Sequence, residues 1–453
     1  MKIGILPYQS QDIVYGSPDN LLRPPWPIFQ ETHEISDGQG KFEKPEDMPL
    51  NRRNFVYRPC GANPFFKELG YCCSEYPFAK PGMNLMDRSD GISLIQNNND
   101  CVSVSNSMGW RTARCDVCIK EGLTYWEVEI VQGGTPSEFD TSHSFQRRKD
   151  VINETPHVRL GISKREASLE SPVGFDSYGY AIRDTSLESI HEGKVAQSLG
   201  AHSLKPGDRL GFLLQLPSSQ TQIDQAKEYT QRRLDALVQS TKSTYQDNEQ
   251  PKKRSKTTNK NFQIALLEDI DHNNIVRDHI AIRYKNQLFF EATDYVKTTK
   301  PEYYSSDKRE RQDYYQLEDS FFAVYLNGEP LGEAFRDLKP FLPPFSELQY
   351  NEKFYFGYWK NGVDDPSHHA KRTGILLRNK YVNNNKLGYY PTISCFNGGT
   401  ARIITTRQDC KYYEQLNKPA KLLEELFDEQ IAEDIIWDMI DEIEEELSDK
   451  GSG

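Results

Sequence analysis

The chain has 453 residues, of which 36% are hydrophobic and 27% are charged. No apolar run approaches the roughly 18 residues that a membrane-spanning helix needs, and Pro7 interrupts the N-terminus too early for a signal peptide. The eight cysteines are scattered and too few for a disulfide scaffold, so we expect a reducing compartment. The net charge of −12 is concentrated in residues 421–449, which hold thirteen Asp or Glu residues and one Lys. The rest of the chain is neutral, so the total charge excludes no class of partner.

Residues 1–82 are predicted to form an extended arm followed by an aromatic-rich segment. The arm contains Leu21–Pro27, a run with three prolines that cannot lie inside a helix. An arm packed along a domain is favoured over a recognition motif.

Residues 83–410 are predicted to form one domain, whose pattern is set by two segments. Residues 123–130 place Trp126, Val128 and Ile130 on one face of a strand, and residues 157–163 repeat the alternation. The turn at Asn327-Gly328 between two apolar runs is a strong hairpin signal. Further strands are predicted at 86–95, 101–114, 209–216, 262–267, 280–290, 321–326, 330–335, 354–359, 389–396 and 401–405. We therefore predict an all-β fold, an antiparallel β-sandwich with long inserted loops and no long helix before Pro419.

Four polar stretches are expected to be disordered insertions, because they lack periodicity and are long for loops of a compact domain. They lie at approximately 135–156, 217–261, 297–319 and 362–387. In the second, residues 223–238 have a solvated helix as the alternative. The cluster Lys252, Lys253 and Arg254 fits a nuclear import signal and a solvated linker equally well.

Residues 419–448 are predicted to form an amphipathic helix that begins after Pro419, and residues 451–453 a possible cloning remnant. The face of this helix opposite its apolar stripe is acidic. Acids near the helix C-terminus oppose the helix dipole, so the isolated helix should be only marginally stable. It should dock into a groove of a partner; packing back on its own sandwich is the alternative. The apolar stripe consists of Leu422, Leu423, Leu426, Phe427, Ile431, Ile435, Ile436, Met439, Ile440, Ile443 and Leu447.

The sequence offers no catalytic, cofactor-binding or metal-binding site. Cys115 and Cys118 form one half of a zinc pattern without a second pair, so packing is the favoured interpretation. His368-His369 is interpreted as part of a solvated loop. Phosphate-binding loops, dinucleotide fingerprints and hydrolase motifs are absent.

The distinctive chemistry is that of binding. Arg159 lies opposite the core face of its strand, and Arg183 ends the segment GFDSYGYAIR, which contains three aromatic residues. Guanidinium groups among aromatic rings suit a carboxylate or a phosphate, because the planar fork bonds in two places and stacks on rings. A local surface ion pair is an equally good interpretation.

WEVEI, VRLGIS, GFDSYGYAIR, KPGDRLGFLLQLP, FFAVYLNGEPLGEAF and YYPTISCF follow one another in this order. The series resembles a SPRY domain over Met83–Thr405. With the C-terminal helix, it is similar to the fungal form of the Ash/Bre-type subunit of the COMPASS (SET-family) histone methyltransferase complex.

The resemblance implies a nuclear adaptor without catalysis of its own, which stimulates histone H3 lysine-4 methylation and so regulates transcription. The SPRY surface would bind an acidic segment of a WD-repeat subunit through Arg159 and Arg183, and the pair would support the SET-domain catalytic subunit. Pro172, Phe175 and Trp110 carry over as neighbours, with Phe175 where the animal form has Tyr. The animal form's N-terminal zinc finger has no matching cysteine pattern here. The C-terminal helix would enter the groove of a Dpy-type helical dimer through Ile431, Ile435, Ile436, Met439, Ile440 and Ile443.

Two other classes of function compete with this hypothesis. A SPRY substrate receptor, for example of a ubiquitin ligase, would have a RING, B-box or cullin-box segment, and none is recognisable. An enzyme or a glycan-binding sandwich would show a compact polar cluster. Nucleosomal DNA contact by basic loops at Arg52-Arg53 and 147–149 is possible, since it needs only positive charge, but solvated loops are favoured.

Overall fold

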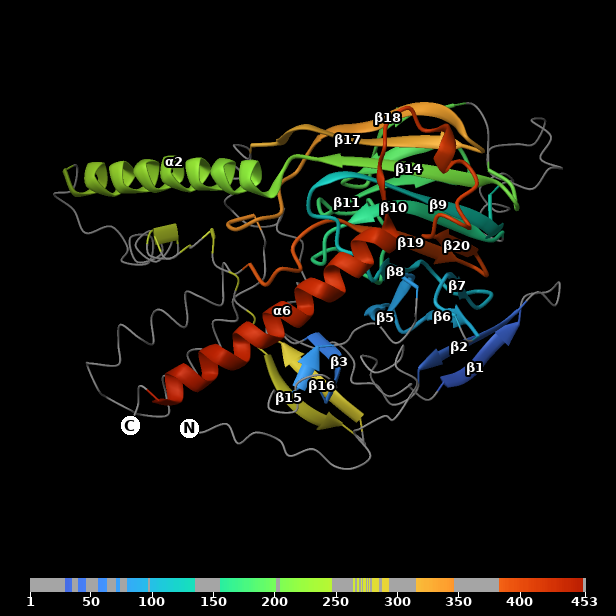
Figure 1. The fold of residues 1–453 in the computed structure, drawn as a ribbon. Coiled ribbons are helices and arrows are strands. Elements are labelled where there is room, and N and C mark those ends of the chain that lie inside the picture. Colours follow the sequence, from blue (N-terminus) through green and yellow to red (C-terminus); the bar gives the residue numbers. More distant parts are fainter. Residues whose placement is uncertain are drawn as a thin grey trace.

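The structure is a computed structural model in which two large β-sheets pack face to face, with a smaller sheet beside them and two long helices (Figure 1). It describes residues 29–34, 40–45, 56–62, 71–73, 80–134 except 97, 155–200, 204–246, 315–345, 383–450 and parts of 264–292. The arm at 1–28 and the basic clusters at 52–53, 147–149 and 252–254 lie outside these residues, as do the predicted strand at 354–359 and the His368-His369 loop.

The first large sheet has ten strands and contains the strand of Trp126. In order across the sheet they are β1 (Phe29–Glu34), β2 (Lys41–Pro45), β6 (Ile92–Ile95), β7 (Cys101–Val104), β20 (Thr400–Ile404), β9 (Gly122–Gln132), β14 (Arg209–Leu216), β17 (Leu317–Leu326) and β18 (Glu329–Leu338), with β21 (Lys421–Leu422) paired to β9. The β17–β18 hairpin turns at Asn327 and Gly328, whose φ angles are 51° and 90°. The predicted hairpin is therefore confirmed, because both turn positions adopt positive φ.

The second large sheet has seven strands, and the third has four. The seven are β13 (Lys194–Ser198), β12 (Glu188–His191), β11 (Gly179–Arg183), β10 (His157–Ser163), β19 (Tyr390–Phe396), β8 (Arg111–Cys115) and β5 (Met83–Arg88). The four are β15 (His279–Tyr284), β16 (Gln287–Ala292), β3 (Val56–Ala62) and β4 (Tyr71–Cys73). Strand pairing within these sheets is antiparallel, which confirms the predicted fold class.

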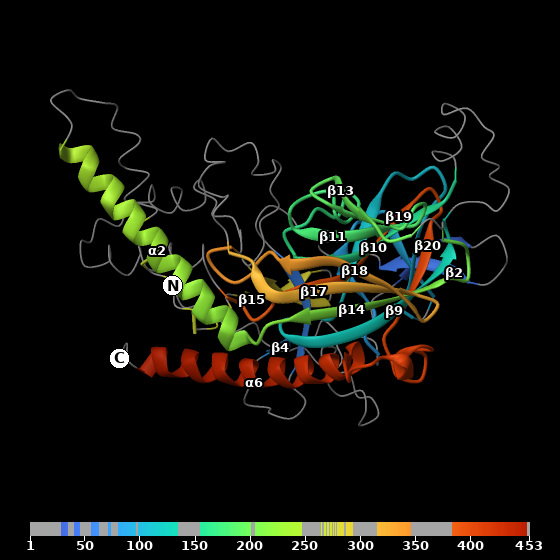
Figure 2. The same ribbon diagram turned by 90° about the horizontal axis from the view of Figure 1, so that it is seen from above.

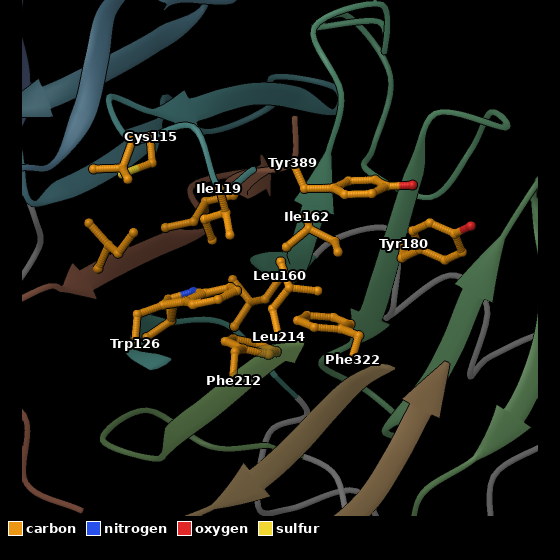
Figure 3. Packing of buried hydrophobic residues seen from close by; sticks show 14 of the residues in the cluster. Cys115, Ile119, Trp126, Leu160, Ile162, Tyr180, Phe212, Leu214, Phe322 and Tyr389 are labelled. Atoms are coloured by element: carbon orange, nitrogen blue, oxygen red, sulfur yellow. The ribbon is translucent and has the colours of Figure 1, made fainter. Parts of the chain in front are cut away.

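The core lies between the two large sheets, and aromatic side chains fill its centre (Figure 3). Trp126 stacks on Phe212 with ring centroids 5.6 Å apart, and Phe212 stacks on Phe322 at 5.3 Å. Leu160 and Ile162 of β10 close the cluster from the facing sheet. Burial of each such side chain contributes about 1.5–3 kcal/mol, so this cluster holds the sheets together.

The outer face of β9 is buried too, although the sequence predicts a half-buried strand. Tyr125 is 1% exposed and Glu127 is fully buried, because the segment between β20 and α6 (Leu423–Lys450) covers this face. The Glu127 carboxylate accepts hydrogen bonds from the N–H groups of Lys411 and Tyr412 at 3.1 and 2.7 Å. A buried carboxylate that binds backbone donors fixes the covering segment to the strand.

The predicted disorder at 217–261 and the predicted lack of a long helix before Pro419 are wrong for residues 219–246, which form helix α2 (Ser219–Gln246). The helical alternative for 223–238 is the correct one, and the helix is longer than predicted. Its first half packs against the body: Ala226 is fully buried, and Tyr229 contacts Phe345 with ring centroids 4.7 Å apart. Both views show α2 extending away from the sandwich (Figures 1 and 2). Tertiary contacts at one end thus stabilise a helix whose composition is that of a linker.

Three strand boundaries also differ from the predictions. The predicted strand at 86–95 is two strands, β5 and β6, because the chain turns at Ser89–Gly91; the N–H of Ile92 donates to Ser89 O at 3.0 Å. The predicted strand at 101–114 is likewise β7 and β8, which belong to different sheets. Residues 280–290 form the β15–β16 hairpin.

Candidate protein-binding surfaces

An arginine pair lies on the outer face of the seven-stranded sheet. Antiparallel pairing of β10 with β11 places Arg159 directly opposite Arg183. Their neighbours along the strands, Leu160 and Ile182, point into the core. Because side chains alternate along a strand, both arginines point away from the core, as the sequence predicts for Arg159.

The two guanidinium groups have different partners. Arg183 Nη1 donates to Glu188 Oε2 at 2.7 Å, and Ser186 Oγ donates to the same oxygen at 2.8 Å. Arg159 instead lies over the ring of Trp110, with its Cζ 5.1 Å from the ring centroid. The buried Nε of Arg159 has no hydrogen-bond partner among the described residues. Arg183 is therefore paired with a carboxylate, whereas Arg159 makes a cation–π contact with an aromatic ring.

The charge state of Arg159 follows from this environment. Burial, and secondarily the neighbouring positive charge of Arg183, lower the pKa of Arg159 to about 10, and Asp184 opposes this change. The group therefore remains protonated at neutral pH. The two cations lie side by side, and Glu188 bonds to Arg183 alone, so Arg159 can accept a further anion.

Neighbouring contacts hold the pair in place. Trp110 packs on Phe396 with ring centroids 5.3 Å apart. Asp184, the residue after Arg183, is 3% exposed and accepts hydrogen bonds from the N–H groups of Val158 and Gly134 at 2.9 and 2.8 Å. The strand ends that carry both arginines are thus fixed by buried polar contacts.

Pro172 and Phe175 lie in a turn that covers the same outer face. The N–H of Phe175 donates to Pro172 O at 3.1 Å, and the N–H of Val173 donates to Ser394 Oγ at 2.9 Å. Gly174 has a φ of +79°, and a Cβ there would lie 2.6 Å from Ile190 O, so only glycine fits. The turn leaves the Phe175 side chain 50% exposed. The five residues predicted for this surface therefore share one face of the sheet.

The predictions missed Glu188 and Ser186. Their contribution depends on the register of the β11–β12 hairpin, which brings Glu188 beside Arg183. No motif in the sequence indicates that register.

The second candidate surface is on α6, whose inner face changes character along its length. In the first turns Leu423 and Phe427 are buried in the core cluster. Further along, the inner positions are Gln430, Asp434 and Asp438, all less than 9% exposed. Residues three or four apart share one face of a helix, so the sandwich side of α6 passes from apolar to acidic.

Cationic side chains from two other segments form ion pairs with the buried acids. Lys386 Nζ lies 2.7 Å from an Asp434 carboxylate oxygen, and Arg277 pairs with Asp438. The predicted single apolar stripe with an acidic solvent face is therefore wrong for this half of the helix. Part of the acidic face points inward, while Ile436 and Ile443 are 56% and 55% exposed. Ile435, Met439 and Ile440 near them are partly exposed, whereas Ile431, which was predicted for the same surface, packs against the core cluster.

The alternative that the helix packs back on its own sandwich holds for its first half, and docking of the second half on a partner stays a prediction. The first half of α6 packs on its own sandwich, and its second half runs past the four-stranded sheet (Figure 2). Ile436 and Ile443 are its exposed large apolar side chains among those described. Single exposed apolar residues are ordinary, but a row of them on one helix is typical of a binding site.

Within the described part of the chain no cluster of three or more His, Cys, Asp or Glu residues is arranged to hold a metal ion. Cys115 and Cys118 are buried, and burial raises the pKa of both thiols, in agreement with the packing interpretation. No helix that the structure describes is long and apolar enough to cross a membrane. The two candidate surfaces are thus an arginine pair on the outer face of an antiparallel sheet and an exposed apolar row on α6.

Comparison with known proteins identifies the family. The chain is 55% identical, over an alignment 500 positions long, to "COMPASS component BRE2" of Saccharomyces cerevisiae, covering 98% of this chain and 99% of that protein. It is 29% identical to "Set1 complex component ash2" of Schizosaccharomyces pombe, covering 93% of this chain and 50% of that protein. No family model matches the chain. The SPRY domain of human HERC1 aligns with 72% of this chain and 99% of that structure, at 10% identity and a TM-score of 0.29.

The chain belongs to the family of BRE2-type COMPASS components. The predicted family is confirmed. The relatives' names describe components of a complex, in agreement with the predicted accessory subunit.

Proposed function

We propose that the protein is a non-catalytic scaffold subunit of a COMPASS-type histone methyltransferase complex in the nucleus. The observation that carries this proposal is the 55% identity to a COMPASS component over nearly the whole of both chains. The relationship favours this function over a substrate receptor of another complex, because a receptor would be related to a different set of proteins.

In this proposal the arginine pair binds an acidic segment of the WD-repeat subunit. The support is chemical: Arg159 is positively charged, largely buried against Trp110, and has an unbonded Nε. A carboxylate of the partner would bind the guanidinium group of Arg159, and charge-assisted bonds to arginine are among the stronger ones. Trp110 and exposed Phe175 would flank the bound segment with apolar surface.

The outer face of α6 is the proposed site for the small Dpy-type helical dimer. Among the side chains of this helix that the structure describes, Ile436 and Ile443 are the most exposed large apolar ones. Ion pairs on the opposite side of the helix keep this row in solvent. With both partners bound, the subunit would support the SET-domain subunit and so stimulate methylation and regulate transcription.

The experiment that tests the proposal is affinity purification of the tagged protein from its own cells, followed by identification of the chains that co-purify. A WD-repeat protein, a SET-domain protein and a Dpy-type protein are expected together. Recovery of a ubiquitin ligase without these subunits would contradict the proposal.

A further inference from the structure

A carboxylate of the protein itself binds one member of the arginine pair, Arg183. Glu188 opens β12 and stands beside Arg183, which stands opposite Arg159, so three charged side chains form a row across the sheet. The nearby acid Asp184 is buried and bound by backbone N–H groups. Glu188 is therefore the acid of this surface that a partner's carboxylate would meet.

We propose that Glu188 is an internal competitor of the partner's acidic side chain, so that binding of the partner exchanges one carboxylate for another at Arg183. The inference rests on the proposed function and adds a residue that sets the strength of the same site.

The geometry favours exchange over a permanent ion pair. The side chains of Arg183 and Glu188 are 38% and 28% exposed, so both reach solvent and can separate without opening the core. Partly exposed ion pairs contribute little to the free energy of folding, so this pair can separate with little loss of stability. Ser186 Oγ also donates to Glu188 Oε2 and would still bind that oxygen after Arg183 turns to the partner.

The two arginines should then contribute unequally to binding. A new carboxylate gains the full interaction at Arg159, whose present neighbour is the Trp110 ring, but at Arg183 it gains only the difference between itself and Glu188. Removal of the Glu188 charge should make Arg183 more important. A residue that only positioned Arg183 would act in the opposite direction.

The test is a double-mutant cycle on the full chain, with the purified WD-repeat subunit as the probe and calorimetry as the readout. Glu188→Gln keeps the shape and removes the charge, and it should strengthen binding about threefold to fivefold. Arg183→Ala should weaken binding more in the Glu188→Gln protein than in the wild type. Glu329→Gln, an exposed acid at the start of β18, makes the same change in net charge and should leave the affinity unchanged.

The outcomes separate the two proposals. If Arg159→Ala weakens binding while Glu188→Gln leaves it unchanged or weakens it, the competitor inference is wrong and the proposed function stands. If Glu329→Gln strengthens binding as much as Glu188→Gln, the effect is one of total charge, and the inference is overturned. If Arg159→Ala has no effect, both proposals fail. Thermal melting of each variant shows that the body is folded.

Discussion

Lys386 and Asp434 form an ion pair of 2.7 Å whose side chains are 4% and 5% exposed, and it joins α6 to the segment before β19. Loss of the Asp434 carboxylate removes the ion-pair partner of a buried lysine. Asp434→Ala is therefore expected to reduce the free energy of unfolding by about 3–5 kcal/mol, or to release the second half of α6.

Denaturant melting and hydrogen exchange along α6 measure these two effects. Glu429→Ala is the matched control on the same helix, since its pair with Lys421 has both side chains 54% exposed and should contribute less than about 1 kcal/mol. Equal losses for the two variants would contradict the structural role of the buried pair.

The outer face of α6 is expected to tolerate charge in the free protein and not in the complex. Replacement of Ile436 and Met439 together with Glu should weaken the Dpy-type dimer at least thirtyfold, or roughly 2 kcal/mol, with little change in melting. Leu423→Ala is the contrasting variant: this side chain is fully buried, so about 2–5 kcal/mol of stability should be lost. Native affinity of the Ile436 and Met439 double variant, or its early melting, would show that the face is structural.

Stability should fall as pH falls below 6.5, in part because of His191. Burial lowers the pKa of His191 from 6.5 to about 4, while its ring stacks on Tyr180 with centroids 4.2 Å apart. Between these pH values the unfolded chain binds a proton that the folded protein does not, so stability decreases with decreasing pH. Burial raises the pKa of Glu192, but the hydrogen bond and charge of Lys339 outweigh burial and lower it, so Glu192 adds to the loss only below its ordinary pKa of 4.5.

His191→Phe keeps an aromatic ring and removes the titration. The difference in urea stability between pH 7 and pH 5 should therefore be smaller in this variant than in the wild type. An unchanged difference would place the pH dependence elsewhere in the protein.

The turn that presents Phe175 depends on Gly174. An added Cβ would meet Ile190 O at 2.6 Å, in addition to the strain of a φ of +79°. Gly207 provides the control, because its φ is +90° but no atom lies within 4 Å of an added Cβ. Gly174→Ala should therefore destabilise the protein by more than Gly207→Ala, which reports about 1–2 kcal/mol of backbone strain alone. Equal effects would mean that the turn moves away from the sheet at little cost.

Period-two alternation predicted the sandwich, because strands with one buried face must show it, and the pattern around Trp126 and Leu160 is strong. Hydrophobic patterning did not predict α2, because Ala226 and Tyr229 are buried by residues far along the chain, such as Phe345. Apolar spacing also predicted the existence of α6. Its inner face could not be predicted from spacing, because cations distant in sequence compensate buried Asp434 and Asp438.

The arginine pair was predictable in part. The outward direction of Arg159 follows from alternation, and the aromatic residues near Arg183 indicated an anion site. The assignment of both arginines to a WD-repeat partner came from the resemblance. The contact of Arg159 with Trp110 and that of Arg183 with Glu188 depend on strand register and loop path, which one sequence does not specify.

The most direct test of the central claim is the affinity of the purified WD-repeat subunit for the Arg159→Ala protein, measured by calorimetry. Loss of a partly desolvated arginine that binds a carboxylate of the partner should reduce the binding free energy by about 2–5 kcal/mol. Binding should therefore weaken at least tenfold, while the melting temperature stays close to that of the wild type. Arg232→Ala on α2, whose side chain is 63% exposed, should bind like the wild type. Native affinity of Arg159→Ala would contradict the account.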